Sequence, residues 1–175
     1  MRMSSFIFRF YAASMEFLKK LIPDRHPLRL LYHKIMAVMA AVWYGFPASS
    51  MTIIAVTGTK GKTTTCNMIA GLLGFAGHKT GMMTSINFQV GERRWSKCLK
   101  QSPLPPFIMQ RLLKEMKTEG CTHVVVEVTS HAVSQHRVFG LSPDIAVLTC
   151  IDEDHIEYHG SHKAYRDEKL KLFKM

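Results

Sequence analysis

The chain has 175 residues, which is enough for one domain with a hydrophobic core and short for two. Apolar residues make up 47% of it and charged residues 21%, which excludes a disordered chain. The net charge is +10, and residues 1–50 carry about half of this excess, with seven basic and two acidic residues. A basic excess suits nucleotides, acidic sugars, nucleic acid or anionic lipid. No basic and aromatic module typical of nucleic-acid binding is present, so we expect no nucleic-acid partner.

The first 49 residues are predicted to form a helical lead. Residues 35–48 are uncharged but number only 14, whereas a membrane-spanning helix needs about 20 apolar residues. Residues 5–22 mix aromatic and basic side chains, and their charges interrupt any signal-peptide core. We expect one or two helices packed on the main domain, and the alternative is peripheral contact of the N-terminus with an anionic membrane surface.

From residue 50 onward, short apolar runs alternate with helical patterns. The runs 51–57, 79–85, 123–128 and 144–149 predict strands, and residues 88–95 predict a hairpin that turns at Gly91–Glu92. Helices are expected over 62–77 and 107–120, and from near Ser161 to the end of the chain. This alternation predicts an α/β domain over residues 50–175, a parallel sheet covered by helices on both faces.

A phosphate-binding loop is predicted between the first strand and the first helix of this domain. Gly58 and Gly61 allow tight turns that present backbone N–H groups to an anion, and the helix adds the positive end of its dipole. Lys62 is expected to reach the β- and γ-phosphates, and the Thr63 hydroxyl to bind magnesium. The strict P-loop pattern has glycine where this chain has Val56. The predicted ATP-binding residues are Gly58, Thr59, Lys60, Gly61, Lys62, Thr63 and Thr64.

Candidate metal ligands follow two later strands. Glu127 ends the run 123–128, and the carboxyl ends of parallel strands gather at one edge of a sheet, beside the loop. There its carboxylate holds magnesium or, alternatively, is simply solvated. His155 follows three acidic residues after the strand 144–149, and these either hold a cation or orient the imidazole. Lys169 lies among several lysines of the last helix, and the pattern alone does not single it out.

The four cysteines show no C-x-x-C or zinc spacing. Because no secretion signal precedes them, reduced thiols in the cytoplasm are the simpler interpretation. They are Cys66, Cys98, Cys121 and Cys150.

Three stretches together resemble the ATP-dependent Mur ligases, in the branch that adds the third residue to the cell-wall peptide. They are VTGTKGKTTT (56–65), EVTSHAVSQHR (127–137) and DHIEYHGSHKAYRDEKLKLF (154–173). The resemblance implies the fold of the family's central ATP-binding domain. It also implies a phosphate-binding Lys62, the magnesium ligands Thr63, Glu127 and His155, and a carbamylated Lys169 that helps hold a second magnesium. The positions implied to contact the substrate are Thr129, Ser130, Gln135 and Arg137.

The implied reaction begins when a carboxylate of a UDP-N-acetylmuramoyl-dipeptide attacks the γ-phosphate of ATP. An acyl-phosphate forms, and the incoming amine then displaces phosphate to give an amide, with Lys62, His155 and Lys169 as the catalytic residues. ATP and Mg²⁺ are therefore the expected cofactors. Two alternatives remain open, a related ligase acting on a folate- or cyanophycin-type acid, and a nucleotide-binding module without ligase activity.

The sequence also departs from the family pattern. Residues 100–103, KQSP, stand where these ligases usually show an Asn-x-Thr-Thr-Pro type of sequence, and Cys150 replaces the asparagine that usually follows Thr149. The family's central domain continues past residue 175 and is followed by a C-terminal domain that brings the incoming amino acid. We therefore expect that this chain alone does not complete ligation.

Overall fold

The structure is a computed structural model, and it describes residues 22–23, 26–96, 104–152, 158 and 160–175. The predictions for residues 100–103, for Cys98 and for His155 lie outside these residues. In the part that is described, no helix is long and apolar enough to cross a membrane.

A six-stranded sheet forms the centre of the domain, in the order β4-β3-β2-β5-β1-β6. The strands β2, β5, β1 and β6 run parallel, and β3 and β4 add an antiparallel hairpin at one edge. The sheet confirms the predicted fold class and the predicted hairpin. The strand bounds are β1 Thr52–Thr57, β2 Thr80–Met83, β3 Asn87–Val90, β4 Arg93–Ser96, β5 His123–Glu127 and β6 Ile145–Leu148.

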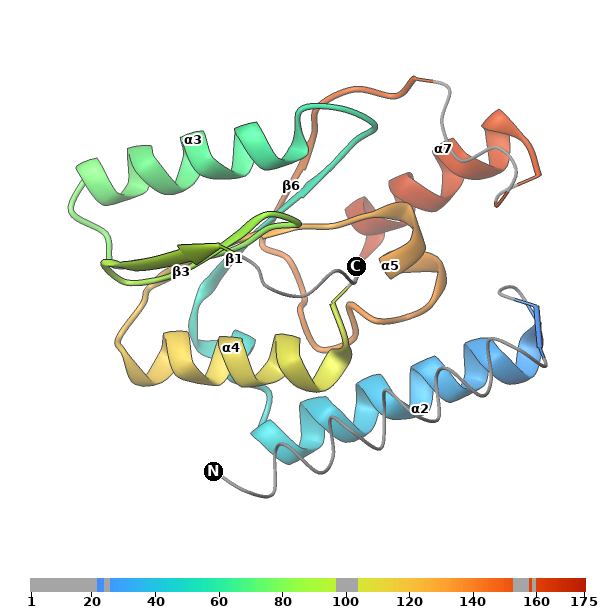
Figure 1. Cartoon of the computed structure of the whole chain (residues 1–175), viewed down its shortest axis with the longest axis horizontal. Coiled ribbons are helices and arrows are strands. Elements are labelled where there is room, and N and C mark those ends of the chain that lie inside the picture. The colour runs from blue at the N-terminus through green and yellow to red at the C-terminus, as the bar shows by residue number, and fades with distance from the viewer. Residues whose placement is uncertain (1–21, 24–25, 97–103, 153–157, 159) are drawn as a thin grey trace.

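Helices cover both faces of the sheet (Figure 1). The helix α3 (Lys62–Phe75) lies on one face, and α4 (Pro106–Thr118) lies on the other, with α2 (Pro27–Tyr44) packed against α4. Alternation along β1 explains the two layers, because successive side chains point to opposite faces. Ile54 and Val56 join the core under α3, whereas Ile53 and Ala55 join the larger core under α4.

Glycines end the two central helices where the sequence predicted. Gly77 follows α3 with a φ of +86°, and the next N–H, that of His78, donates to the Leu73 carbonyl. Gly120 follows α4 in the same way, with a φ of +76°. Left-handed backbone at this position is typical of glycine, and it satisfies carbonyls that the helix leaves without partners.

Three shorter elements lie near the carboxyl edge of the sheet, and one lies under its other edge. They are α5 (Ser130–Ser134), α7 (His162–Leu170), the 3₁₀ turn η2 (Lys171–Lys174) and the 3₁₀ turn η1 (Pro47–Ser50). The last helix was expected to run to the end of the chain, but it tightens into η2 after Leu170. The helix α5 directly follows β5 and packs against α7, so residues 129–137 begin at the carboxyl edge of the sheet.

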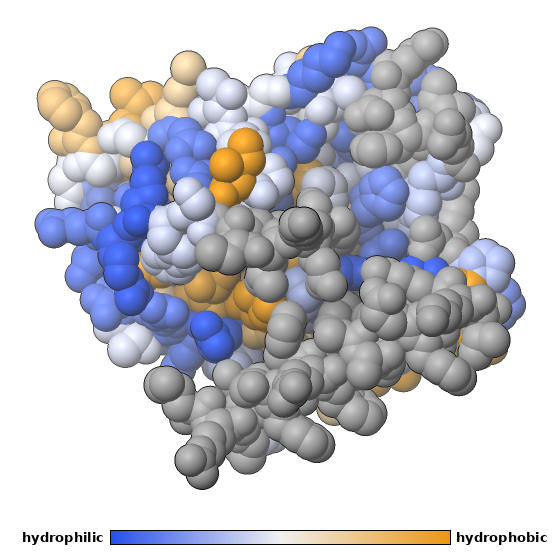
Figure 2. Space-filling model, viewed as in Figure 1, coloured by the Kyte–Doolittle hydropathy of each residue, from blue (hydrophilic) through white to orange (hydrophobic). Residues whose placement is uncertain are grey.

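Two helices expose apolar side chains. On α3, Met68, Leu72 and Phe75 are exposed, and the orange side chains at the upper left of Figure 2 lie over the C-terminal end of this helix. On α2, the apolar side chains opposite the α4 contact are also exposed. They are Leu28, Leu31, Ile35, Met39, Val42 and Trp43.

Candidate phosphate and metal site

The predicted phosphate loop connects β1 to α3 through two left-handed glycines. Gly58 has a φ of +148° and Gly61 a φ of +79°. A Cβ atom at Gly58 would lie 1.9 Å from Thr149 Oγ1, so the segment after β6 approaches too closely for any side chain at position 58. At both positions the backbone therefore has a conformation that glycine adopts most readily.

The loop leads into the N-terminus of α3, which has the features of an anion site. Gly61 is the N-cap, no side chain among the described residues caps the helix, and its first turn contains no acidic residue. The first N–H groups of a helix have no partner within the helix, and the helix dipole makes this end positive. Lys62 adds an ammonium group, which donates to the Thr59 carbonyl over 2.9 Å. Backbone amides, dipole and lysine thus converge where a phosphate group can bind.

A cluster of oxygen atoms lies beside this helix end. The Thr63 hydroxyl donates to Glu127 Oε2 over 2.8 Å, and the Ser85 backbone N–H donates to the same oxygen over 2.9 Å. Ser85 Oγ lies 3.1 Å from that oxygen and 3.2 Å from Thr63 Oγ1. Sheet register explains the meeting, because Val56 at the end of β1 pairs with Glu127 at the end of β5.

These oxygens fit a magnesium ion, which prefers carboxylate and hydroxyl oxygens. No three His, Cys, Asp or Glu side chains of the described residues lie close enough together to hold a metal ion. The cluster therefore combines one carboxylate, that of Glu127, with the hydroxyls of Thr63 and Ser85. Phosphate oxygens and water usually complete such a site.

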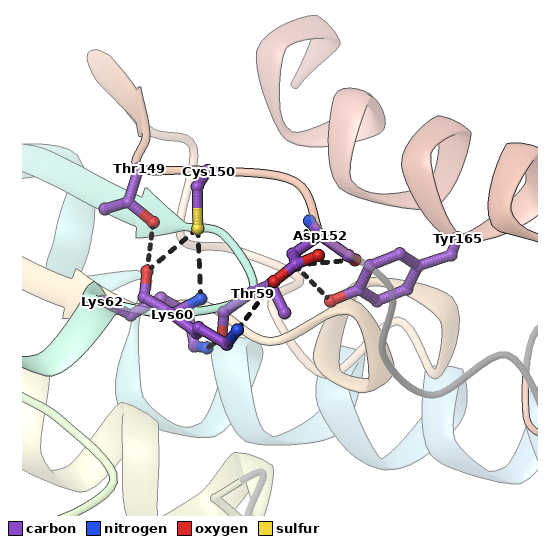
Figure 3. A network of polar contacts seen from close by, with 7 residues as sticks. All are labelled: Thr59, Lys60, Lys62, Thr149, Cys150, Asp152 and Tyr165. Atoms are coloured by element: carbon purple, nitrogen blue, oxygen red, sulfur yellow. Dashed lines mark hydrogen bonds and ion pairs between the residues drawn. The ribbon is translucent and has the colours of Figure 1, made fainter.

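The segment after β6 holds the phosphate loop from outside (Figure 3). Thr149 Oγ1 donates to the Lys60 carbonyl over 2.6 Å, and the Thr59 N–H donates to the Cys150 carbonyl over 2.9 Å. The Asp152 carboxylate forms an ion pair with Lys60 at 2.7 Å. The Lys60 N–H lies 3.4 Å from Cys150 Sγ, and this contact lowers the pKa of the exposed thiol.

The helix α7 supports the loop from a second side. Lys169 Nζ donates to the Gly58 carbonyl over 2.7 Å and lies 4.4 Å from the centre of the Tyr165 ring. The Lys169 side chain is only 2% exposed. The Tyr165 hydroxyl lies 3.0 Å from Thr59 Oγ1. Lys169 is thus brought to the loop, although 111 residues separate it from Gly58.

The structure places the four candidate substrate residues around α5. Thr129 caps this helix by accepting from the Ala132 N–H over 3.2 Å, and Ser130 is buried next to it. Gln135 donates to the Tyr158 hydroxyl over 3.4 Å. Thr129 and Arg137 line a small pocket together with Glu127 and Ser85, whereas Ser130 and Gln135 do not. The pocket floor is apolar and includes Met83, Leu104, Met109, Val126 and Val138.

A buried histidine lies within electrostatic reach of Arg137. His33 of α2 is fully buried, and neither ring nitrogen has a hydrogen-bond partner among the described residues. Burial, followed by the charges of Arg137 and Arg29, lowers the pKa of His33 to about 3. The imidazole is therefore neutral at pH 7, so no further positive charge is added beside Arg137.

Sequence reasoning did not single out Ser85, Asp152 or Tyr165. Ser85 follows β2, and the logic that placed Glu127 at the carboxyl edge of a parallel sheet applies equally to it. Asp152 was recognised only as one of three acidic residues, and nothing in the sequence indicated its pairing with Lys60. Tyr165 is an aromatic residue on α7, which the sequence pattern alone assigns to packing. Its contact with Thr59 depends on how this helix packs.

Comparisons with known proteins agree on the family. The family model of the Mur ligase middle domain matches residues 56–175. The UDP-N-acetylmuramyl-tripeptide synthetase of Roseiflexus sp. (strain RS-1) is 41% identical over 142 residues, which are 80% of this chain and 28% of that protein. The UDP-N-acetylmuramoyl-L-alanyl-D-glutamate–2,6-diaminopimelate ligase of Geobacillus kaustophilus is 39% identical over 140 residues, again 80% of this chain and 28% of that protein.

Solved structures lead to the same fold. A structure of a UDP-N-acetylmuramoyl-L-alanyl-D-glutamate–2,6-diaminopimelate ligase matches with a TM-score of 0.56 and 31% identity, over 70% of this chain and 24% of that one. E. coli FolC in complex with DHPP and ADP matches with a TM-score of 0.58 over 78% of this chain and 38% of that one, and its 22% identity shows the fold alone. The chain spans about 28% of the length of the curated relatives named above. The protein belongs to the Mur ligase family, and most of the chain corresponds to the middle domain of these ligases.

Proposed function

We propose that this chain is the ATP-activating part of an amide ligase of peptidoglycan precursor synthesis in the cytoplasm. The ligase adds an amino acid to a UDP-N-acetylmuramoyl-dipeptide through an acyl-phosphate. One observation carries the proposal, the contact of 2.8 Å between Thr63 Oγ1 and Glu127 Oε2 at the N-terminus of α3. It joins a phosphate loop to a carboxylate from a neighbouring strand, as ATP-dependent phosphoryl transfer requires. The activities for which these relatives are named support the substrate class.

The loop residues bind and orient the triphosphate. Gly58 to Thr64 supply backbone N–H groups, and Lys62 exchanges the Thr59 carbonyl for phosphate oxygens. The energetic contribution of such a site is mainly positioning and neutralisation of charge, because phosphoryl transfer asks little covalent chemistry of the protein.

Thr63, Glu127 and Ser85 would hold Mg²⁺ next to these phosphates. When it is bound, the ion neutralises part of the charge that develops on the transferred phosphate. His155 remains a proposed ligand on the basis of the family resemblance. Lys169 lies against the same loop, which supports the proposal that its carbamylated form helps to hold a second magnesium ion.

The pocket beside Glu127 is the proposed site of the acyl substrate. Arg137 lines it, and its guanidinium group suits a carboxylate or phosphate of the substrate. Thr129 lines the same pocket, while Ser130 and Gln135 are proposed to contact the substrate from α5. Two alternatives stay open, a ligase acting on a folate- or cyanophycin-type acid and a nucleotide-binding module without ligase activity.

Nucleotide titration of a loop variant tests the proposal. Lys62→Ala should weaken ATP binding tenfold or more, which is on the order of 1.4 kcal/mol. Lys79→Ala is a matched control. The Lys79 side chain is also partly exposed, and its ion pair with Glu119 is long, at 3.9 Å, so its removal should cost little stability. Unchanged ATP affinity in Lys62→Ala would remove the loop assignment. Competition between UDP-muramoyl-dipeptide and folyl-glutamate for the ATP-loaded chain then separates the two ligase classes, and binding of neither favours the non-catalytic module.

The helix α2 supports a second proposal, peripheral contact with an anionic membrane surface. Its exposed face is apolar, and the sequence from Pro27 to Gly91 contains no acidic residue. Apolar surface next to basic charge is the combination that binds anionic interfaces. The chain should therefore co-sediment with vesicles that contain anionic lipid, and Ile35→Gln should reduce the fraction that co-sediments. Equal binding to neutral vesicles would contradict the contribution of the basic charge.

A further inference from the structure

Three lysines reach the phosphate loop, and one of them differs from the other two. Lys62 Nζ and Lys169 Nζ donate to carbonyls of the loop itself, those of Thr59 and Gly58. Lys60 extends instead to the Asp152 carboxylate, with 2.7 Å between Nζ and Oδ2 (Figure 3). Its ammonium group is therefore held beside the loop by a side chain that comes from another segment.

The backbone of Lys60 is fixed, but its side chain is exposed. The Lys60 carbonyl accepts from Thr149 Oγ1 over 2.6 Å, and its N–H contacts Cys150 Sγ. The side chains of Lys60 and Asp152 are 76% and 53% exposed. Lys60 can thus change rotamer without any movement of the loop, because solvent surrounds most of its side chain.

The Lys60–Asp152 pair is easily exchanged for a stronger partner. An exposed ion pair contributes little to stability, because water screens both charges. A triphosphate carries several negative charges, whereas Asp152 carries one, so Coulomb attraction favours the phosphate once it is near.

The position of the pair indicates which phosphate Lys60 contacts. The Asp152 N–H donates to Thr59 Oγ1 over 3.0 Å, and Thr59 Oγ1 in turn contacts Tyr165 of α7. Figure 3 shows Asp152 between Lys60 and Tyr165. Lys62 is expected to reach the β- and γ-phosphates, and the exposed Lys60 ammonium would add a second positive charge at the terminal phosphate.

We propose that Lys60 is a positioning residue that leaves Asp152 to contact the terminal phosphate of ATP. Asp152 is then the counter-ion of the empty loop and competes with the nucleotide for Lys60. The pair lets the loop distinguish ATP from ADP. This inference rests on the proposed function, because it requires nucleotide phosphates to bind between Gly58 and Thr64.

Calorimetric titration of the whole chain with ATP and with ADP, both with magnesium, tests the proposal. Lys60→Met keeps the aliphatic stem and removes the charge, so it should weaken ATP binding about five- to tenfold and ADP binding less than about twofold. Lys60→Arg should restore most of the ATP affinity. Asp152→Asn should instead strengthen ATP binding about two- to fivefold, because the competing carboxylate is gone. Lys79→Met is the control and should change neither affinity.

A merely structural ion pair gives a different pattern. If the ion pair were only structural, removing the charge of Lys60 or of Asp152 would have the same effect on ATP affinity. Equal losses of ATP affinity in Lys60→Met and Asp152→Asn would therefore overturn the proposal. Equal losses for ATP and ADP in Lys60→Met, or no change in either, would also overturn it. Lys62→Ala distinguishes a wrong role for Lys60 from a wrong loop assignment. If Lys62→Ala loses affinity for both nucleotides while Lys60→Met keeps both affinities, only the role of Lys60 is wrong. If Lys62→Ala keeps its affinity for both nucleotides, the loop assignment itself is wrong.

Discussion

Replacing Gly58 by alanine should disrupt the phosphate loop more than any other single methyl group added to it. The new Cβ would lie 1.9 Å from Thr149 Oγ1 and 3.1 Å from both the N and O atoms of Cys150. Thr149 is a short side chain, and its hydroxyl donates to the Lys60 carbonyl over 2.6 Å and lies 3.3 Å from the Thr57 carbonyl. The hydroxyl therefore has to leave both carbonyls, or the loop has to move away from β6.

The size of the effect follows from these contacts. The Thr149 hydroxyl has one proton to donate, so its displacement loses one hydrogen bond, which costs about 1 kcal/mol. The φ of +148° at Gly58 adds about 1–3 kcal/mol for a residue with a side chain. The free energy of unfolding should fall by about 2–4 kcal/mol, which is a shift of about 1–2 M in the urea midpoint. ATP affinity should fall with it, because the same backbone presents the amides that are proposed to bind phosphate.

Gly74→Ala provides the matched control. Gly74 lies exposed in α3 with nothing within 4 Å of its added Cβ, so the same substitution should stabilise the chain by about 0.5–1 kcal/mol. Urea unfolding of the two variants beside the unmodified chain measures both effects. A Gly58→Ala chain with an unchanged urea midpoint and unchanged ATP affinity would refute the claim that β6 closes tightly on the loop.

Three further predictions concern ionisable groups. Because the pKa of His33 in the folded chain is about 3, below its usual 6.5, the stability due to its neutral form is complete above pH 6.5 and is lost as the pH falls toward 3. The loss should reach about 2 kcal/mol at pH 5, and His33→Leu should remove this part of the pH dependence of urea unfolding; identical pH profiles would contradict it. Glu127→Gln should weaken ATP binding about tenfold with magnesium and little without it, and calorimetry that finds the same loss in both conditions would exclude a magnesium role. Lys169→Met should destabilise the chain by about 1–3 kcal/mol through the buried Gly58 carbonyl that it leaves unpaired, and an unchanged urea midpoint would show that this contact contributes nothing.

The elements of the fold could be predicted because local patterns determine them. The strand β1 and the helix α3 begin within one residue of the expected positions, and Gly77 and Gly120 stop their helices as expected. The strand order could not be predicted, because periodicity shows which residues are buried but not which strands become neighbours. The short helix α5 was missed because five residues are too few for a helical period to show.

The arrangement of the candidate site residues was predictable where one motif contains them, and unpredictable where packing brings them together. Lys62 and Thr63 belong to a contiguous pattern, and the edge rule for parallel sheets brought Glu127 to them. The pairing of Lys60 with Asp152 joins residues 92 positions apart, and no pattern of spacing encodes it. Burial of His33 beside Arg137 likewise depends on how α2 packs, which the amphipathic pattern of a single helix does not specify.

A crystal structure of this chain with a non-hydrolysable ATP analogue and magnesium would show the phosphate loop at work. We expect the phosphates on the backbone N–H groups of Gly58 to Thr64, with Thr63 and Glu127 at the metal ion. Phosphates bound elsewhere on the chain, or a loop between β1 and α3 that remains closed on itself with the analogue bound outside it, would contradict the account.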